Sequence, residues 1–175
     1  MDLKEYIRSI PDYPKKGILF RDITTLIKNE KAFAECINQI VEKSKNYQFD
    51  KIAAIESRGF VFASAVSYIL KKPFIMLRKK NKLPADVHSV DFELEYGTAT
   101  IEVHKDSINE NENVLIIDDL IATGGTAEAA AKLIEISKGK VSAFIFVINL
   151  FDLPGNNMLL KKGFKTECLI EFPGH

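Results

Sequence analysis

The stretch Val114-Leu-Ile-Ile-Asp-Asp-Leu-Ile-Ala-Thr-Gly-Gly-Thr126 determines how the rest of the chain is interpreted. Its first four residues are apolar and mostly branched, which predicts a strand buried on both faces. Asp118 and Asp119 follow where this strand should reach the surface. A loop of small residues, Ala122 to Thr126, then leads into an alanine-rich helical segment, Ala127 to Ile136. The stretch therefore predicts one strand–loop–helix unit of an α/β protein.

The loop of this unit has the chemistry of a sugar-phosphate site. Backbone N–H groups at a helix start bind phosphate oxygens, and the helix dipole adds to the attraction. Gly124 and Gly125 let the backbone approach a ligand and adopt positive φ. Ionised carboxylates such as Asp118 and Asp119 accept hydrogen bonds from ribose hydroxyls. A plain strand–loop–helix connection explains the same spacing, so both interpretations stay open. The absence of a Walker lysine and of a third glycine argues against ATPases and NAD enzymes.

The composition is that of an ordinary globular domain. The 175 residues suffice for one domain with a core, and 46% are hydrophobic and 27% charged. Basic and acidic residues number 24 each, so we expect neither a nucleic-acid partner nor a membrane. Cys36 and Cys168 lie far apart without a partner motif, which favours a buried free thiol at Cys36 and a cytoplasmic location. The histidines are not at ligand spacing, so a metal would arrive on a phosphate, as Mg²⁺ does.

Strand-like and helix-like segments alternate along the chain. This alternation predicts a mainly parallel sheet with helices on both faces, whose ligands bind at the carboxyl ends of the strands. Asp118, the turn Glu56 to Gly59 and Arg78 all fall at such ends, so three polar clusters should share one rim. The expected helices are Leu3 to Ile10, Lys31 to Lys45, Gly59 to Leu70 and Ala127 to Ile136, and the expected strands are Lys51 to Ile55, Pro73 to Leu77, Val114 to Ile117 and Val141 to Leu150, before a final helix and strand.

Two of these clusters could bind anions. Glu56-Ser57-Arg58-Gly59 joins a strand to a helix, and its successive N–H groups and forked arginine suit a phosphate, although a simple capping turn has the same residues. Arg78-Lys-Lys-Asn-Lys-Leu-Pro84 places four cations in five positions. Such a run is commonly a solvated surface, but directly after a strand it would also stabilise a pyrophosphate leaving group.

Together these motifs resemble those of the type I phosphoribosyltransferases. Val114 to Thr126 is similar to the phosphoribosyl pyrophosphate signature of that family. The turn Glu56 to Gly59 is similar to its pyrophosphate loop, in which the bond corresponding to Glu56–Ser57 is often cis. Three further segments resemble the adenine phosphoribosyltransferases in particular: Pro14-x-x-Gly17-x-x-Phe20-Arg21-Asp22, Arg78-Lys-x-x-Lys-Leu-Pro84 and Leu94-Glu-Tyr-Gly97.

The resemblance implies a fold, a reaction and partners. We expect a single α/β domain over residues 1–175 with the type I phosphoribosyltransferase fold, a mainly parallel sheet flanked by helices. It would include an N-terminal hood over residues 1–30 and a flexible loop over about residues 80–98. The reaction would combine adenine with phosphoribosyl pyrophosphate and give AMP and pyrophosphate, with Mg²⁺ bound through the substrate phosphates. A homodimer is expected from the family alone.

The same resemblance implies roles for individual residues. Phe20 would stack on adenine, and backbone groups of Leu19 and Arg21 would match its N6 donor and N1 acceptor. Glu95 would exchange a proton with adenine N7 as the catalytic base, and Tyr96 would help to close the loop. The other catalytic residues would be Arg58, Asp118 and Asp119, pyrophosphate would be bound by Ser57, Arg58, Arg78, Lys79 and Lys82, and the 5′-phosphate of AMP by Ala122, Thr123, Gly124, Gly125 and Thr126.

Two alternatives remain at this point. A xanthine or guanine phosphoribosyltransferase would share the sugar-phosphate motifs, but Phe20-Arg21 and Leu94 to Gly97 argue against it. A purine-responsive regulator on the same fold would need a DNA-binding module, for which we see neither spare length nor a basic face. Gly174-His175 has no counterpart in the resemblance, and we expect a ragged tail there.

Overall fold

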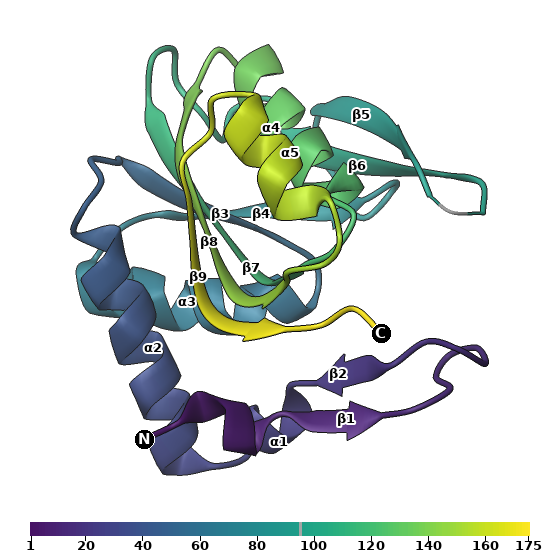
Figure 1. Ribbon diagram of the computed structural model, residues 1–175. Helices are drawn as coiled ribbons and strands as arrows, with labels where there is room; N and C mark the ends of the chain where they lie inside the picture. Colours follow the sequence, from purple (N-terminus) through teal and green to yellow (C-terminus); the bar gives the residue numbers. More distant parts are fainter. Residues whose placement is uncertain (95) are drawn as a thin grey trace.

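A seven-stranded sheet in the order β5-β6-β4-β3-β7-β8-β9 forms the body of the molecule (Figure 1). The computed structural model describes residues 1–94 and 96–175. The strands from β4 to β9 in that order run parallel, and β6 is antiparallel to both β4 and β5, so the predicted mainly parallel sheet is confirmed. The strands are β3 (Lys51–Ile55), β4 (Phe74–Lys79), β5 (Val87–Glu93), β6 (Thr98–His104), β7 (Asn113–Ile121), β8 (Lys140–Leu150) and β9 (Thr166–Phe172).

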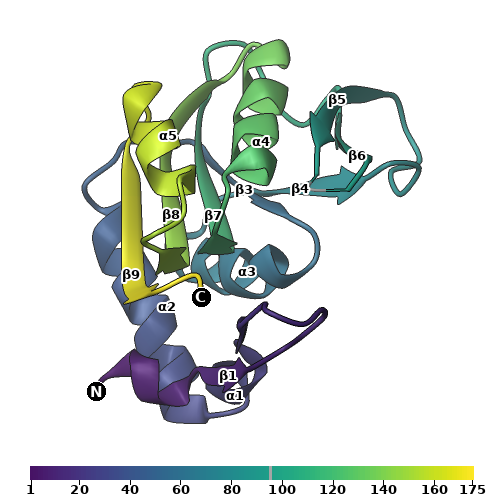
Figure 2. The ribbon, with the colours of Figure 1, turned by 45° about the vertical axis from the view of Figure 1, so that its right-hand side comes forward.

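Helices cover both faces of this sheet, which divides the core into two clusters (Figure 2). The first cluster includes residues of α2 (Glu30–Ser44) and α3 (Arg58–Leu70), and the second includes residues of α4 (Gly125–Ile136) and α5 (Gly155–Lys161). Strand β7 supplies both clusters because successive side chains point to opposite faces: Leu115 packs in the first and Ile116 in the second.

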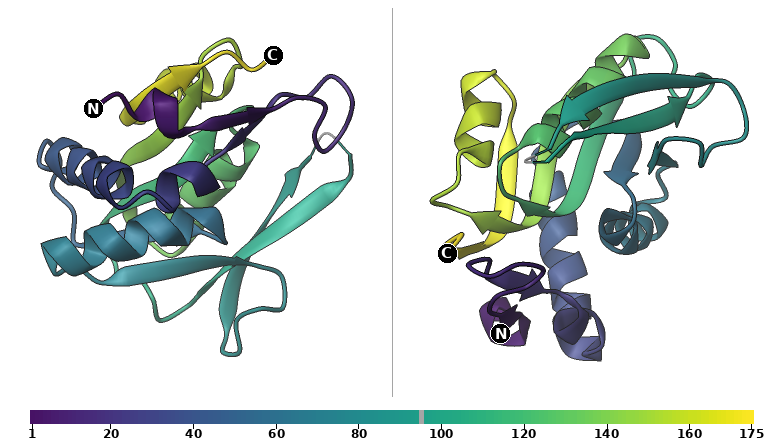
Figure 3. Two further views of the ribbon diagram at one scale, coloured as in Figure 1. Left: turned by 90° about the horizontal axis from the view of Figure 1, so that it is seen from below. Right: turned by 90° about the vertical axis from the view of Figure 1, so that its right-hand side faces the viewer.

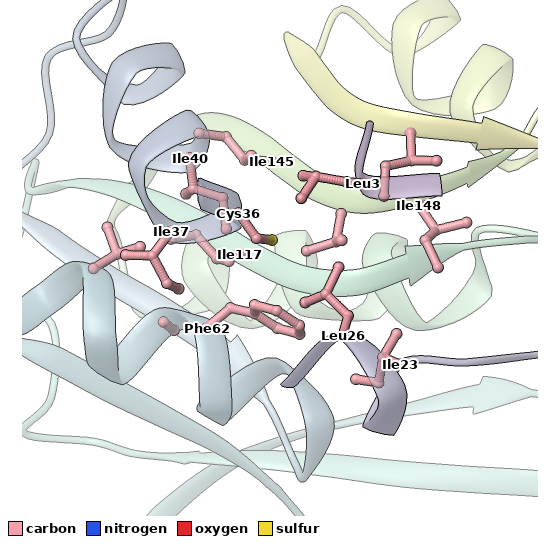
Figure 4. Packing of buried hydrophobic residues seen from close by; sticks show 14 of the residues in the cluster. Leu3, Ile23, Leu26, Cys36, Ile37, Ile40, Phe62, Ile117, Ile145 and Ile148 are labelled. Carbon is pink, nitrogen blue, oxygen red and sulfur yellow. The ribbon is translucent and has the colours of Figure 1, made fainter. Parts of the chain in front are cut away.

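Helix α2 forms where apolar residues recur at helical spacing, and it buries that apolar face. Asn29 caps its start by accepting a hydrogen bond from the Ala32 N–H at 3.0 Å. The apolar side chains of α2 face inward, and Cys36 lies fully buried beside Ile37 and Ile40 (Figure 4). Burial raises the pKa of the Cys36 thiol to about 12, so it packs as a small apolar group. The predicted free buried thiol is confirmed.

The N-terminal segment differs from the helix predicted over Leu3 to Ile10. Only η1 (Leu3–Tyr6) is helical, and β1 (Arg8–Ile10) pairs with β2 (Phe20–Asp22) in a separate two-stranded sheet that leads to α1 (Thr24–Ile27). The prediction is wrong in its second half because the pairing is set by a distant partner. Arg8 donates to Asp22 through Nε at 3.0 Å and Nη2 at 2.5 Å, a contact that local periodicity does not reveal. We use the name hood for residues 1–30, which contain these elements.

Two predicted boundaries also moved. Strand β7 does not end before the aspartates but continues to Ile121, because β8 extends beside it until Asn149 pairs with Ile121. Part of the segment predicted as a flexible loop is strand β5, which pairs with β6 and packs against α4. Its flexibility stays a prediction. Among the described residues no helix is both long and apolar enough to cross a membrane.

Candidate active site

The chain reverses its winding direction between β3 and β7, and a cavity lies at that point. From β3 it passes through α3 to β4 on one side, and from β7 it passes through α4 to β8 on the other. In such sheets the ligand crevice forms at the carboxyl ends of the strands where the order reverses. A cavity of about 910 Å³ occupies this place, with a lining that includes Ser57, Arg58, Lys79, Lys80, Lys82, Asp118, Asp119, Ala122, Thr123, Gly124 and Thr126. The three predicted polar clusters therefore do share one rim.

Helix α4 begins at this cavity with free backbone donors. Gly124 has φ of +92°, a left-handed conformation that suits glycine, and it turns the chain from β7 into the helix. No side chain in the described part of the chain caps this start. The first N–H groups of α4 and the positive end of its dipole are therefore available to an anion. Gly125 is the one member of the predicted loop that does not line the cavity.

Helix α3 offers a second start of the same kind. Its N-cap residue, Ser57, makes no capping hydrogen bond, and the Glu56–Ser57 peptide is cis, as the resemblance implies. Gly59 lets the first turn of α3 lie close to β7: a Cβ there would be 2.8 Å from Oδ1 of Asp118. Two helix starts from opposite faces of the sheet thus meet at one cavity, and both attract negative charge.

The two adjacent aspartates differ in environment. Asp119 is 6% exposed, and its Oδ2 lies 2.8 Å from Nε of Arg58. Asp118 Oδ1 accepts the backbone N–H of Asp119 at 2.8 Å. Burial raises the pKa of Asp118 well above the ordinary carboxyl value, and the charge of Asp119 raises it further. The charged form of Asp118 is consequently disfavoured, a perturbation that is common among residues of functional sites.

Arg58 connects the aspartates to the hood. Besides its ion pair with Asp119, its guanidinium carbon lies 5.6 Å from the ring centroid of Phe20. Leu19, Phe20 and Arg21 do not line the cavity themselves. The hood nevertheless places Phe20 beside a residue that does.

The basic run after β4 is shaped by two carboxylates. Glu56 Oε1 accepts the backbone N–H of Lys79 at 2.6 Å and lies 3.4 Å from Nε of Arg78. Glu102, 6% exposed, accepts the N–H of Asn81 at 2.8 Å and the hydroxyl of Ser89 at 2.6 Å. These contacts fix the loop from which the lysines reach the cavity.

The cations of this run that line the cavity differ from the predicted set by one residue, Lys80 in place of Arg78. Lys79 and Lys82 line the cavity as predicted, but Arg78 does not. Arg78 is instead paired with Glu56 and stands opposite Glu102 in the strand register. Lys80 lines the cavity and was missed, because a run of consecutive cations does not reveal which of them face inward.

The hairpin and the hood approach one another over the site. The Nζ of Lys15 lies 3.7 Å from the ring centroid of Tyr96, and the hood loop extends toward the hairpin tip in Figure 3. Tyr96, predicted to help close the loop, thus touches the hood. The predicted catalytic base, Glu95, lies outside the described residues.

One residue that supports the site was not found from the sequence. Gly155, at the start of α5, donates its N–H to the carbonyl of Ala122 at 2.9 Å. A Cβ on Gly155 would lie 2.5 Å from that carbonyl oxygen. The start of α5 is therefore packed directly against the phosphate-type loop. In the sequence, a glycine after a proline indicates only a turn, so the contact between Gly155 and Ala122 could not be predicted from it.

Comparison with known proteins identifies the class to which this fold and site belong. The phosphoribosyl transferase domain family matches residues 22–164. An adenine phosphoribosyltransferase of Pelagibacter ubique is 79% identical over all 175 residues and 100% of both chains. The structure of adenine phosphoribosyltransferase from Thermoanaerobacter pseudethanolicus is 46% identical with a TM-score of 0.94, covering 98% of each chain. That from Saccharomyces cerevisiae, complexed with an imino-altritol bisphosphate and adenine, is 33% identical with a TM-score of 0.89, covering 96% of each.

The chain therefore belongs to the adenine phosphoribosyltransferase family. The resemblance drawn from the sequence motifs is confirmed, and with it the fold and the transferase class. The individual site roles stay predictions, which the cavity geometry now places in space.

Proposed function

We propose that the chain transfers the 5-phosphoribosyl group of phosphoribosyl pyrophosphate to N9 of adenine, giving AMP and pyrophosphate in purine salvage. The observation that carries this proposal is the pair of uncapped helix starts at one cavity, with two carboxylates between them. The donor has a phosphate at one end, a pyrophosphate at the other and a ribose between, which matches that order of groups. The yeast relative, solved with adenine and a bisphosphate, supports the same pair of subsites.

Each part of the donor has a complementary group in the cavity. The 5′-phosphate binds at Ala122 to Thr126 on the start of α4, where backbone N–H groups supply the hydrogen bonds. The ribose hydroxyls donate to Asp118 and Asp119. Pyrophosphate binds the turn at Ser57 and Arg58 and is neutralised by the cavity lysines, Lys79, Lys80 and Lys82.

Adenine is proposed to lie under the hood beside Phe20. Strand β2 has a partner strand on one side only, so its other edge carries backbone donors and acceptors that are free to read a base. One carbonyl and one N–H match the N6 donor and N1 acceptor of adenine. Hypoxanthine and guanine present the opposite pair and would leave buried polar groups unpaired.

Catalysis in this proposal consists of positioning and electrostatics. As the bond to pyrophosphate breaks, positive charge develops on the sugar close to the carboxylates of Asp118 and Asp119, while Arg58 and the lysines stabilise the departing oxygens. Attack by N9 needs removal of the purine proton, which the resemblance assigns to Glu95. Closure of the loop that carries Tyr96 would exclude the water that otherwise hydrolyses the donor, and the contact of Tyr96 with Lys15 of the hood supports this role.

Mg²⁺ is proposed to enter with the substrate. In the described part of the chain, no three His, Cys, Asp or Glu residues come together as a metal site. The phosphate oxygens of the substrate are the hard ligands that Mg²⁺ prefers, so the ion would be held through them and not by a direct protein ligand. Bound there, the ion would neutralise charge on the pyrophosphate.

A homodimer is proposed from the family. The structure supports a dimer through apolar side chains that are exposed to solvent in the single chain. Val61, Tyr68 and Ile69 of α3 are 36%, 85% and 48% exposed, and Met76 of β4 is 45% exposed. Light scattering of the wild type and of Tyr68→Glu tests it, since a dimer held by these side chains should dissociate in the variant. A cytoplasmic location remains a prediction that rests on the free cysteines.

The decisive experiment is a panel of bases. Adenine, guanine, hypoxanthine, xanthine and uracil are each supplied with phosphoribosyl pyrophosphate and Mg²⁺, and nucleotide formation is measured. AMP from adenine alone is the expected result, and Lys82→Met should weaken donor binding while Lys45→Met, directly after α2, should not. Turnover of an oxopurine in preference to adenine would favour the xanthine or guanine alternative. Tight ligand binding without any turnover would overturn the enzymatic proposal.

A further inference from the structure

The side chain of Arg21 ties the hood to the opposite end of the chain. The residue is 9% exposed, and its guanidinium donates from Nη1 to the hydroxyl of Ser9 at 2.5 Å and from Nη2 to the carbonyl of Pro173 at 2.9 Å. Its central carbon lies 4.4 Å from the ring centroid of Phe172. A buried cation persists only where such partners compensate for lost water. The guanidinium thus contacts both β1 of the hood, through Ser9, and the C-terminal end of the chain, through Phe172 and Pro173.

The tail that receives Arg21 is not ragged, contrary to the sequence-based prediction. The Phe172 carbonyl accepts the N–H of Phe151 at 3.0 Å, and Gly174 donates its N–H to the Asp152 carboxylate. A Cβ on Gly174 would lie 2.8 Å from that carboxylate and 2.8 Å from Cγ of Leu153. The tail passes between the body and the hood in both views (Figures 1 and 2). It is a fitted part of the fold that the short sequence Phe-Pro-Gly-His did not indicate.

The anchoring of Arg21 bears on its neighbour Phe20. Successive side chains of a strand point to opposite faces. With Arg21 held against Phe172 on one face of β2, the ring of Phe20 is presented on the other, where it meets Arg58 of the cavity. The β1–β2 sheet has only two strands and little core of its own, so its placement depends on such contacts.

We propose that Arg21 is a positioning residue for base recognition. Its contacts with Phe172 and Pro173, here called the clasp, fix the position and orientation of β2. The C-terminal end of the chain thereby supports the adenine site without touching the base. This inference rests on the proposed function, because it assumes that β2 reads the base. It predicts that Phe172 and Pro173 control the affinity for adenine without touching it, although they lie 151 and 152 positions after Arg21 in the sequence.

Kinetics of four variants test the clasp. Arg21→Met and Phe172→Leu should each raise KM for adenine about tenfold, the equivalent of losing one desolvated cation–π contact or charged hydrogen bond. Their kcat and their KM for phosphoribosyl pyrophosphate should stay within about twofold, and Arg21→Lys should restore part of the loss. Lys4→Met is the matched control: its Nζ lies 5.2 Å from the same Phe172 ring, but Lys4 is in η1 and not in β2. It should leave KM for adenine unchanged.

Binding experiments separate positioning from a purely structural role. Calorimetry compares AMP with ribose 5-phosphate, which lacks the base. Arg21→Met and Phe172→Leu should weaken AMP about tenfold and leave ribose 5-phosphate unaffected. Equal weakening of both ligands, or a lower melting temperature with both affinities intact, would overturn the clasp. If the wild type forms no AMP from adenine, the proposed function itself fails, which is a different result.

Discussion

The backbone of Gly155 rests directly against that of Gly124: a Cβ on Gly155 would lie 2.8 Å from the nitrogen of Gly124, and one on Gly124 would lie 2.9 Å from Cα of Gly155. Neither neighbour is a flexible side-chain end that could turn away. The start of α5 therefore sets the shape of the loop at the start of α4. This contact links α5, whose residues do not line the cavity, to the subsite proposed for the 5′-phosphate.

Gly155→Ala is accordingly expected to distort the phosphate loop. The added methyl overlaps the Ala122 carbonyl and the Gly124 nitrogen, so the loop must shift. Overpacking of this kind costs about 1–3 kcal/mol, and we expect both a lower melting temperature and at least tenfold weaker AMP binding by calorimetry. Asn157→Ala, at an exposed position of the same helix, is the control. Unchanged AMP affinity in Gly155→Ala would show that α5 does not shape the loop.

Asp118→Asn should stabilise the free protein and inactivate it. Since the folded pKa of Asp118 is raised, ionisation of this carboxyl group opposes folding at neutral pH; the opposition begins to fall as the pH drops through the folded pKa and is gone only below the unfolded one. The neutral amide removes it at all pH values. Each kcal/mol gained raises the melting temperature of a domain of this size by about 2–4 °C.

Asp119→Asn is the matched comparison for this prediction, because it breaks the 2.8 Å ion pair with Arg58 and should not stabilise. Scanning calorimetry and AMP formation are the two measurements. A melting temperature of Asp118→Asn at or below that of the wild type at pH 7 would contradict the assignment of an unfavourable charge to Asp118.

Glu102→Gln should loosen the lysine loop and change the acid limb of the stability curve. The hydrogen bonds from Ser89 and Asn81 hold the pKa of Glu102 below its ordinary value, which is about 4.5. A depressed folded pKa means that the stabilisation is complete above the unfolded value and is lost as the pH falls through the folded one. The difference in free energy of unfolding between wild type and Glu102→Gln should therefore be constant near neutral pH and shrink below about pH 4.5.

Urea denaturation across pH 3 to 7 measures this difference, and pyrophosphate affinity should fall in parallel because Lys80 and Lys82 lose their fixed loop. Glu110→Gln, an exposed acidic residue outside the site, controls for the general effect of removing a carboxylate. A difference that grows toward low pH would reverse the predicted sign and refute the role of Glu102.

Glu95→Gln tests the catalytic base that the resemblance assigns. Loss of a general base lowers turnover about 10²–10⁴-fold, whereas an amide still hydrogen-bonds. We expect that loss in kcat with AMP affinity within about fivefold. Glu93→Gln, at an exposed position in β5, should retain turnover. A Glu95→Gln enzyme with near wild-type kcat would require a different proton acceptor.

The order of elements and most of the rim were predictable because they depend on local patterns. Lys51–Ile55 matches β3 residue for residue, and the Asp118-Asp119 stretch lies at the cavity as its spacing indicated. Apolar runs and glycine-rich loops indicate the structure of the few residues around them, so they can be interpreted without knowledge of distant contacts. The family resemblance then supplied the acceptor base, which no pattern in the sheet could indicate.

What could not be predicted depends on contacts between distant residues. The strand Arg8–Ile10 forms because it pairs with β2, which contains Asp22. The side chain of Arg21 contacts Phe172 and Pro173, and the backbone of Gly155 donates to Ala122. The choice of Lys80 over Arg78 as a cavity cation follows from the register of β4 against β6, which brings Arg78 opposite Glu102. None of these pairings leaves a periodic signal in the sequence.

The two helix starts at the cavity belong to different halves of the core, since α3 packs in the cluster on one face of the sheet and α4 in the cluster on the other. A donor bound at both ends is therefore a bridge between two separately packed layers. If the subsites are as proposed, a substitution in the core cluster of α3 should change the affinity for pyrophosphate more than that for the 5′-phosphate, and one in the cluster of α4 should do the reverse.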